Sequence, residues 1–218
     1  QAAVINCPSE AGGSGSGYAS SGTGLYKNDI FWLGWSCGAT TLFNPGDTVN
    51  KSWTLANGLQ INAQITNLTA ALFPYNTGNW SGDMLDDLYG GVNPIGLNDF
   101  NSGQDPTYTI SFTANLNGTS ILADIVAAEA EDTGHFDESA TWTTDGSAWQ
   151  PIDALGALSA QFTNGGKTVF MSNDPDAGGG TLLAFSRGVS NIVVDMKAGG
   201  REALAFGIFS SFDYGDIK

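Results

Sequence analysis

Apolar and polar residues alternate along short stretches of this chain, and a period of two is typical of a β-strand with one face in water. The pattern is clearest over residues 59–66 (LQINAQIT), and it returns over residues 107–116 (TYTISFTANL). No long stretch shows the helical period. The chain is therefore predicted to be all-β.

Turn-forming residues separate these stretches. Asn57-Gly58 and Asn117-Gly118 favour tight hairpins, because both central residues of such a turn need positive φ. The run 164–166 (NGG) predicts a further hairpin, and residues 119–131 are expected to form one long strand. Asp145-Gly146 is a turn of the same preferred type, so the block around it is predicted to fold back as a hairpin.

About a dozen strands at this spacing predict a two-sheet antiparallel β-sandwich of the lectin-like or jelly-roll type. The 30 glycines and the 13% of charged residues suit short strands and polar turns rather than a helical bundle. Residues 1–27, rich in Gly and Ser, are predicted to form an N-terminal arm, and residues 28–218 one sandwich domain. Tryptophans within strand patterns are expected in the core: Trp32, Trp35, Trp53 and Trp142.

The chain has 2 cysteines, Cys7 and Cys37. One pair in a chain of this composition predicts a disulfide and an oxidising compartment, hence a secreted or cell-surface protein. The bond would tether the arm, in which residues 3–5 are a candidate strand. That strand either packs on its own chain or is donated to a neighbouring subunit.

The formal net charge is −15 at pH 7. Such an acidic surface repels phosphate, so nucleic acid and anionic membranes are not expected partners. No apolar run approaches the ~20 residues that span a bilayer. The loop acids are either solvated or calcium ligands, and the oxygen-rich positions suited to calcium are Asp83, Asp87, Asn173, Asp174 and Asp176.

Features of catalytic sites are sparse. The single histidine, His135, lies in a charged turn, and no nucleophile, metalloprotease or nucleotide motif occurs. Glu129, Glu131 and Glu138 could in principle hydrolyse a glycoside, but nothing in their spacing singles them out. We therefore expect no enzymatic activity and no cofactor other than calcium.

Residues 74–106 lose the alternation, and the segment is too long for an ordinary connection, which points to a functional role. Residues 84–88 within it could form a short helical turn. Exposed aromatics beside polar loop groups commonly bind sugars or peptides, although core packing is the alternative. The candidate ligand-binding residues are Trp80, Asp83, Asp86, Asp87 and Tyr89.

Three segments occur in an order that resembles a known family: 129–131 (EAE), 141–149 (TWTTDGSAW), and 205–216 with its AFGIF and FDYGD runs. They resemble the lectin-like, non-repetitive ligand-binding domain of CshA-type bacterial fibrillar surface adhesins, over residues 28–216. The resemblance implies a secreted or surface-attached β-sandwich that binds host or neighbour-cell macromolecules without catalysis.

Two functions follow as hypotheses. In the first, the chain is an extracellular adhesin-type domain that recognises a glycan or an extracellular-matrix or cell-surface protein through residues 74–106 and their neighbours. In the second, it is a structural subunit of a surface filament, assembled when the N-terminal arm or the C-terminal tail is donated to the next copy.

Overall fold

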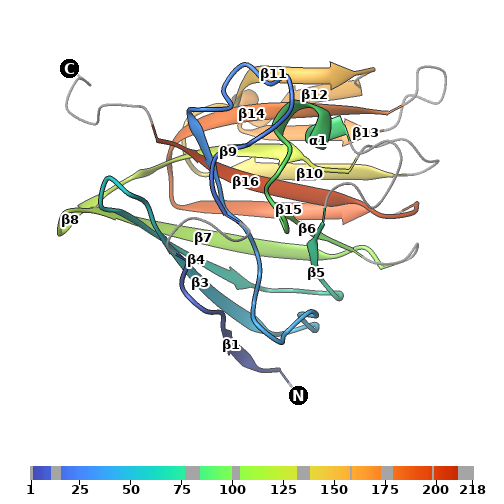
Figure 1. Cartoon of the computed structure of the whole chain (residues 1–218). Coiled ribbons are helices and arrows are strands. Elements are labelled where there is room, and N and C mark those ends of the chain that lie inside the picture. The colour runs from blue at the N-terminus through green and yellow to red at the C-terminus, as the bar shows by residue number, and fades with distance from the viewer. Residues whose placement is uncertain are drawn as a thin grey trace.

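The computed structural model describes residues 2–10, 16–76, 84–99, 104–131, 138–157, 159–172, 179–197 and 199–210. Within these ranges two β-sheets pack against each other (Figure 1). The strands pair antiparallel there, except that β1 and β3 are parallel. The all-β sandwich is therefore confirmed.

The nine-stranded sheet has the order β1 (Val4–Asn6), β3 (Thr48–Thr54), β4 (Leu59–Thr66), β7 (Thr107–Leu116), β15 (Asn191–Lys197), β10 (Ser139–Thr144), β13 (Thr168–Ser172) and β12 (Ser159–Thr163), with β8 (Thr119–Ile121) on β7. The seven-stranded sheet has the order β11 (Gln150–Gly156), β14 (Gly180–Val189), β9 (Ala123–Glu129), β16 (Ala203–Phe209), β6 (Gly96–Asn98) and β5 (Phe73–Tyr75), with β2 (Ile30–Trp32) on β16. One α-helix, α1 (Met84–Tyr89), and a 3₁₀ turn, η1 (Asn164–Gly166), complete the described elements.

The main core lies between the sheets, and it takes the apolar residues of the alternating strands. A second apolar cluster lies on the outer face of the seven-stranded sheet, where α1 and the segment before β2 cover it. Trp35, Trp53 and Trp142 belong to the first cluster and Trp32 to the second, and all have 0% exposure, so the core assignment is confirmed. In the part of the chain that the structure describes, no helix is long and apolar enough to cross a membrane.

Three predicted hairpins are confirmed. They are β3–β4 around Asn57-Gly58, β7–β8 around Asn117-Gly118, and β12–β13 around η1. The helical turn expected at residues 84–88 is present as α1.

The predicted Asp145-Gly146 hairpin is wrong. β10 pairs with β13 and β15 in one sheet, whereas β11 pairs with β14 in the other. The chain therefore crosses between the sheets at this turn. The physical reason is a long-range contact: the Asp145 carboxylate accepts the backbone N–H groups of Ser190 and Asn191, each at 2.9 Å.

The single strand predicted over residues 119–131 is also wrong. β8 stays with β7, and the chain then changes sheet at Leu122, whose side chain is 64% exposed. β9 continues in the seven-stranded sheet between β14 and β16. Its residues are buried on both faces, because the second apolar cluster covers the outer side.

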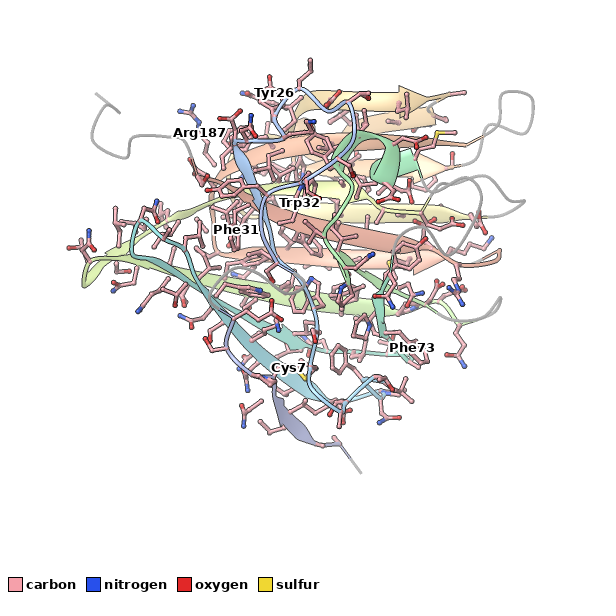
Figure 2. The ribbon with its side chains drawn as sticks, in the orientation of Figure 1. Cys7, Tyr26, Phe31, Trp32, Phe73 and Arg187 are labelled. Atoms are coloured by element: carbon pink, nitrogen blue, oxygen red, sulfur yellow. A yellow bond between two sulfur atoms is a disulfide. The ribbon has the colours of Figure 1, made fainter. Side chains whose placement is uncertain are left out.

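The N-terminal arm lies on its own chain. β1 pairs with β3 and forms the edge of the nine-stranded sheet at the bottom of Figure 1, and the predicted Cys7–Cys37 disulfide is confirmed. Figure 2 shows Cys7 at this lower edge and Tyr26, later in the same segment, at the opposite end of the molecule. The domain boundary at residue 27 stays a prediction.

Candidate functional site

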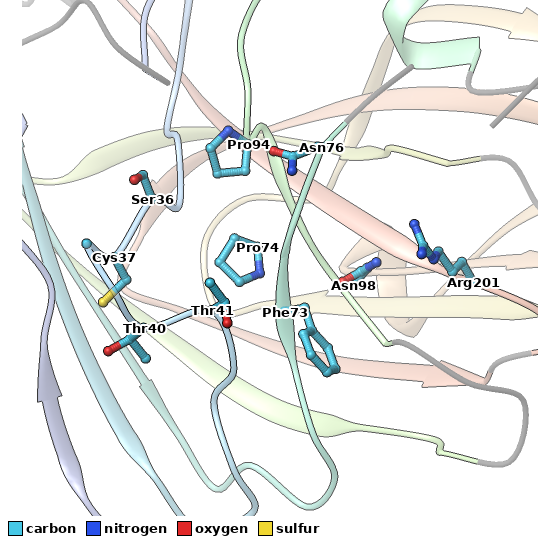
Figure 3. A pocket seen from close by; sticks show the side chains of 11 residues that line it. Ser36, Cys37, Thr40, Thr41, Phe73, Pro74, Asn76, Pro94, Asn98 and Arg201 are labelled. Carbon is cyan, nitrogen blue, oxygen red and sulfur yellow. The ribbon is translucent and has the colours of Figure 1, made fainter. Parts of the chain in front are cut away.

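A pocket of about 390 Å³ opens where the segment after Trp35 passes the edge of the seven-stranded sheet (Figure 3). One side is formed by the loop 36–41, and β5 and the start of the turn before β6 form the middle. The far side is formed by the end of β6 and the residue that leads into β16. The lining residues are Ser36, Cys37, Gly38, Thr40, Thr41, Phe73, Pro74, Asn76, Pro94, Asn98 and Arg201.

Backbone contacts fix each wall. Cys37 is held by the disulfide, and its carbonyl accepts the N–H of Thr40 at 3.1 Å to form a turn. The N–H of Trp35 donates to the carbonyl of Pro94 at 3.0 Å, which joins the loop to the turn before β6. β5 and β6 pair from Phe73 opposite Asn98, so both residues face the pocket edge together. The site is thus assembled by three segments that are distant in sequence.

The pocket offers hydrogen-bonding groups beside apolar surface. Ser36, Thr40 and Thr41 carry hydroxyls, Asn76 and Asn98 carry amides, and Arg201 brings a guanidinium, while Phe73 and two prolines supply apolar surface. Asn98 is 3% exposed, and its side-chain oxygen has no hydrogen-bond partner in the described ranges. A buried amide oxygen without a partner is costly, so a donor that reaches it gains free energy.

Carboxylates lie directly behind this pocket. Successive residues of a strand point to opposite faces. Asn98 and Arg201 therefore face the pocket, whereas the adjacent Asp99 and Glu202 point into the space between the sheets. Both acids are 0% exposed. The N–H of Glu202 donates to Asp99 Oδ1 at 3.0 Å, and the N–H of Ala203 donates to Glu202 Oε1 at 3.2 Å.

The electrostatics of this pair are dominated by burial. Burial raises the pKa of Asp99 to about 7, with the Glu202 N–H opposing the rise and Asp105 and Glu138 adding to it. Burial also raises the pKa of Glu202 well above its ordinary value, and the carboxylates of Glu131, Asp99 and Glu138 raise it further. Tyr108, on β7 in the opposite sheet, has its pKa raised by burial and by the same two acids, Asp99 and Glu202.

Three of the predicted ligand-binding residues lie away from this pocket. Asp86, Asp87 and Tyr89 are on α1, and they do not line the pocket. Tyr89 is buried, and its hydroxyl donates to Asp153 at 2.6 Å and accepts the N–H of Tyr26 at 3.3 Å. Trp80 and Asp83 lie outside the described residues. A ligand-binding role for these side chains stays a prediction.

Of the calcium candidates, only Asp87 belongs to the described residues. Asp83, Asn173, Asp174 and Asp176 lie outside the described ranges, and Asp87 is exposed on α1. Among the described residues, no group of three or more His, Cys, Asp or Glu side chains is arranged to hold a metal ion.

Sequence reasoning placed the site in residues 74–106, and this segment contributes Pro74, Asn76, Pro94 and Asn98. It missed the loop 36–41, Phe73 and Arg201. The available signal was the disulfide, which brings Cys37 and the following Gly38 to a fixed position. Arg201 had no comparable signal, because its place depends on the pairing of β16 with β6.

A second hollow, of about 550 Å³, lies on the outer face of the nine-stranded sheet. It is lined mainly by amides and hydroxyls from β1, β3, β4 and β7. Some of these amides bond one another, for example Gln64 to Asn50 at 2.8 Å and Asn50 to Asn6 at 2.9 Å. These side chains already satisfy each other laterally, so this hollow is the weaker candidate.

Comparison with solved structures finds the N-terminal domain of the Streptococcus gordonii adhesin Sgo0707, with a TM-score of 0.43 and 9% sequence identity. The match covers 94% of this chain and 64% of that one, so the chain spans less than two thirds of that domain. No curated protein sequence matches the chain. The family described as surface adhesin CshA non-repetitive domain 2 matches residues 28–209. Because this match covers most of the 218 residues, the chain belongs to the family of CshA non-repetitive domain 2 surface adhesin domains.

Proposed function

We propose that this chain is an adhesin-type binding domain that captures a glycan or a protein of a host or neighbouring cell in the pocket between the loop 36–41 and β6. Membership in a surface adhesin family implies a cell-surface or extracellular location and suggests a non-enzymatic binding role. The observation that carries the pocket assignment is Asn98, which lines the pocket and whose buried amide oxygen lacks a hydrogen-bond partner in the described ranges.

The lining defines the ligand chemistry. Hydroxyl and amide groups pair with sugar hydroxyls or with peptide groups, because both offer donors and acceptors together. Phe73 provides a ring against which the apolar face of a sugar or a side chain can pack. Arg201 supplies a positive charge on an otherwise acidic chain, so a ligand with a carboxylate near this wall is favoured over a cationic one.

The filament alternative requires the arm or the tail to leave its own chain. The contacts of the arm favour the binding domain, since the disulfide and the Glu10–Lys51 ion pair both hold the arm to this chain. The tail after residue 210 lies outside the described residues. Light scattering on the purified chain separates the two functions, because a binding domain stays monomeric whereas a filament subunit forms polymers.

The binding test is a screen of glycans and extracellular-matrix proteins, followed by titration of each hit with variants. Arg201→Gln and Asn98→Ala should each weaken binding by about tenfold or more, the equivalent of ~1.4 kcal/mol. Lys27→Ala is the charge-matched control, because Lys27 follows Tyr26, at the far end of the molecule from Phe73 (Figure 2).

Asn62→Ala is the amide-matched control, since Asn62 lines the second hollow. Unfolding curves must show that each variant is folded. Unchanged affinity in the two pocket variants together with a loss in Asn62→Ala would move the binding site to the outer face of the nine-stranded sheet and overturn the pocket assignment.

A further inference from the structure

Asp99 and Glu202 are neighbours across two paired strands. β6 and β16 are in register from Ala205 opposite Gly96 to Ala203 opposite Asn98, which places Asp99 level with Glu202. The N–H of Asp99 donates to the carbonyl of Glu202 at 3.1 Å, which confirms that the backbones remain paired there. Directly opposite residues in an antiparallel pair have their Cβ atoms about 5 Å apart, so the two carboxyl groups are within mutual reach.

In each of the two carboxyl groups, only one of the two oxygens has a hydrogen-bond partner among the described residues. One oxygen of each accepts a backbone N–H, while Asp99 Oδ2 and Glu202 Oε2 have no hydrogen-bond partner among the described residues. Tyr108 is 1% exposed, and its hydroxyl also lacks a partner there. Neither Asp99 nor Glu202 has an ion-pair partner in the same ranges.

Further acids face the pair from the surrounding elements. On β9, Leu204 is opposite Glu129, so Glu131 is level with Glu202. Glu138 precedes β10 in the facing sheet and is buried, and Asp105 precedes β7. Among the described residues, the cationic group beside the pair is that of Arg201, which lies on the pocket side of the same strand end. The field at Asp99 and Glu202 is therefore set by carboxylates, and two adjacent buried carboxylates do not both ionise readily.

We propose that Asp99 and Glu202 share a proton, so that a carboxyl–carboxylate hydrogen bond joins the ends of β6 and β16 beneath the binding pocket and makes that pocket sensitive to pH. One O–H donates to the other group's free oxygen, and both orphan acceptors are then satisfied. Loss of this proton to solvent leaves two like charges between the sheets. The repulsion separates the strand ends that carry Asn98 and Arg201. The pocket walls are therefore held together less tightly at alkaline pH and more tightly at acidic pH.

The direction in which stability changes with pH follows from the difference in bound protons between the folded and unfolded chain. Burial raises the pKa of Asp99 to about 7 in the folded chain from its ordinary 3.8, and it raises the pKa of Glu202 well above its ordinary value. Between those values the native state binds more protons than the unfolded state, so stability falls as pH rises through this window. The pair titrates as a unit, and the proton is not assigned to either residue alone.

The first test is the thermal midpoint of the full chain against pH, and it needs no ligand. The parent should lose about 5 °C or more between about pH 5 and pH 8. Glu202→Gln and Asp99→Asn each keep the shape of the side chain and remove one of the two titrating carboxyl groups, so each should show a smaller fall in its midpoint, and the double variant should show the smallest. Asp195→Asn, an exposed acid on β15, is the control and should follow the parent. Parallel profiles for the parent and both isosteric variants would overturn the proposal.

Infrared difference spectra supply a direct readout of the proton. The parent at neutral pH should show a protonated-carboxyl band that Glu202→Gln lacks, and absence of the band in the parent would also overturn the proposal. So would a pH profile that flattens when calcium is added, because the pair would then hold a metal ion instead of a proton.

The link to the pocket rests on the proposed function and is tested separately. Hydrogen exchange in peptides covering residues 95–99 and 36–41, corrected for the intrinsic pH dependence, should slow in acid in the parent but not in Glu202→Gln. If the exchange rates change with pH equally in the parent and in Glu202→Gln, the pair does not control the pocket, even where the shared proton has been demonstrated. A ligand screen without a hit in the pocket would contradict the proposed function, but the thermal and infrared results on the shared proton would still stand.

Discussion

Lys51 Nζ lies 2.6 Å from the Glu10 carboxylate, and the Lys51 side chain is fully buried while that of Glu10 is 15% exposed. Lys51 also donates to the backbone carbonyls of Pro8 and Ser36. These acceptors come from both sides of the disulfide. A single ammonium group on β3 therefore holds the arm and the pocket loop in place, which explains how a Gly-rich arm keeps a defined position.

Breaking this ion pair from one side should be costly. Glu10→Gln leaves a buried ammonium without its counter-charge, and we expect a loss of about 3 kcal/mol in the free energy of unfolding. The double variant Glu10→Gln/Lys51→Met removes the charge altogether and should recover part of that loss. Urea denaturation of the disulfide-intact protein measures both. A Glu10→Gln variant within about 0.5 kcal/mol of the parent would show that water already reaches Lys51.

Asp145 should give the opposite pH dependence to the Asp99–Glu202 pair. Burial acts to raise its pKa, but hydrogen bonds from the backbone and side chain of Asn191 and from Ser190 outweigh it, so the pKa is lowered. A lowered pKa gives stability that is present above about pH 4 and is lost as pH falls through the folded value. Asp145→Asn should cost about 1 kcal/mol at neutral pH, because the side chain is largely exposed.

The measurement is the urea midpoint of the parent and Asp145→Asn at neutral pH and in acid. The gap between them should close in acid, where the parent carboxylate is protonated. A gap that stays constant with pH would mean that the turn depends on side-chain shape rather than on the negative charge.

The same turn shows where the sequence stops being informative. Strands such as 59–66 were predictable because a period of two is local, and the disulfide because two cysteines allow one pairing. The chemistry of Asp145-Gly146, however, suits a hairpin and a crossing between sheets equally. The choice is made by Ser190 and Asn191, which are distant in sequence, so no local pattern could reveal it.

The candidate site was predictable in part for the same reason. The long segment 74–106 lacks strand alternation, and that was a usable signal. Arg201 and the loop 36–41 join the pocket through strand pairing and the disulfide. Asp99 and Glu202 look like ordinary loop acids in the sequence, because burial between two sheets is a property of the finished fold.

Tyr89 offers a test of the sequence-based ligand prediction against a structural role. Its hydroxyl is bonded to Asp153 and to the N–H of Tyr26, so Tyr89→Phe should lower stability by about 1–2 kcal/mol. Because the ring stays in place against Trp32, the fold should be retained. Ligand binding should be unchanged in the titrations that use Arg201→Gln. A Tyr89→Phe variant of parental stability that no longer binds would restore Tyr89 as a ligand contact.

Close packing of β2 against β16 explains why the apolar run 205–209 contains a glycine, Gly207. A Cβ at this position would lie 2.6 Å from Ile30 Cγ2 and 3.3 Å from the carbonyl oxygen of Phe31. β2 therefore approaches β16 more closely than a side chain allows. Gly207→Ala should lower the free energy of unfolding by about 1–3 kcal/mol through overpacking. Chemical denaturation measures the loss. Ile30→Ala removes the clashing methyl group, so the double variant should be more stable than the sum of the two single losses predicts. Strict additivity would place the strain at the backbone of Phe31 instead of at Ile30.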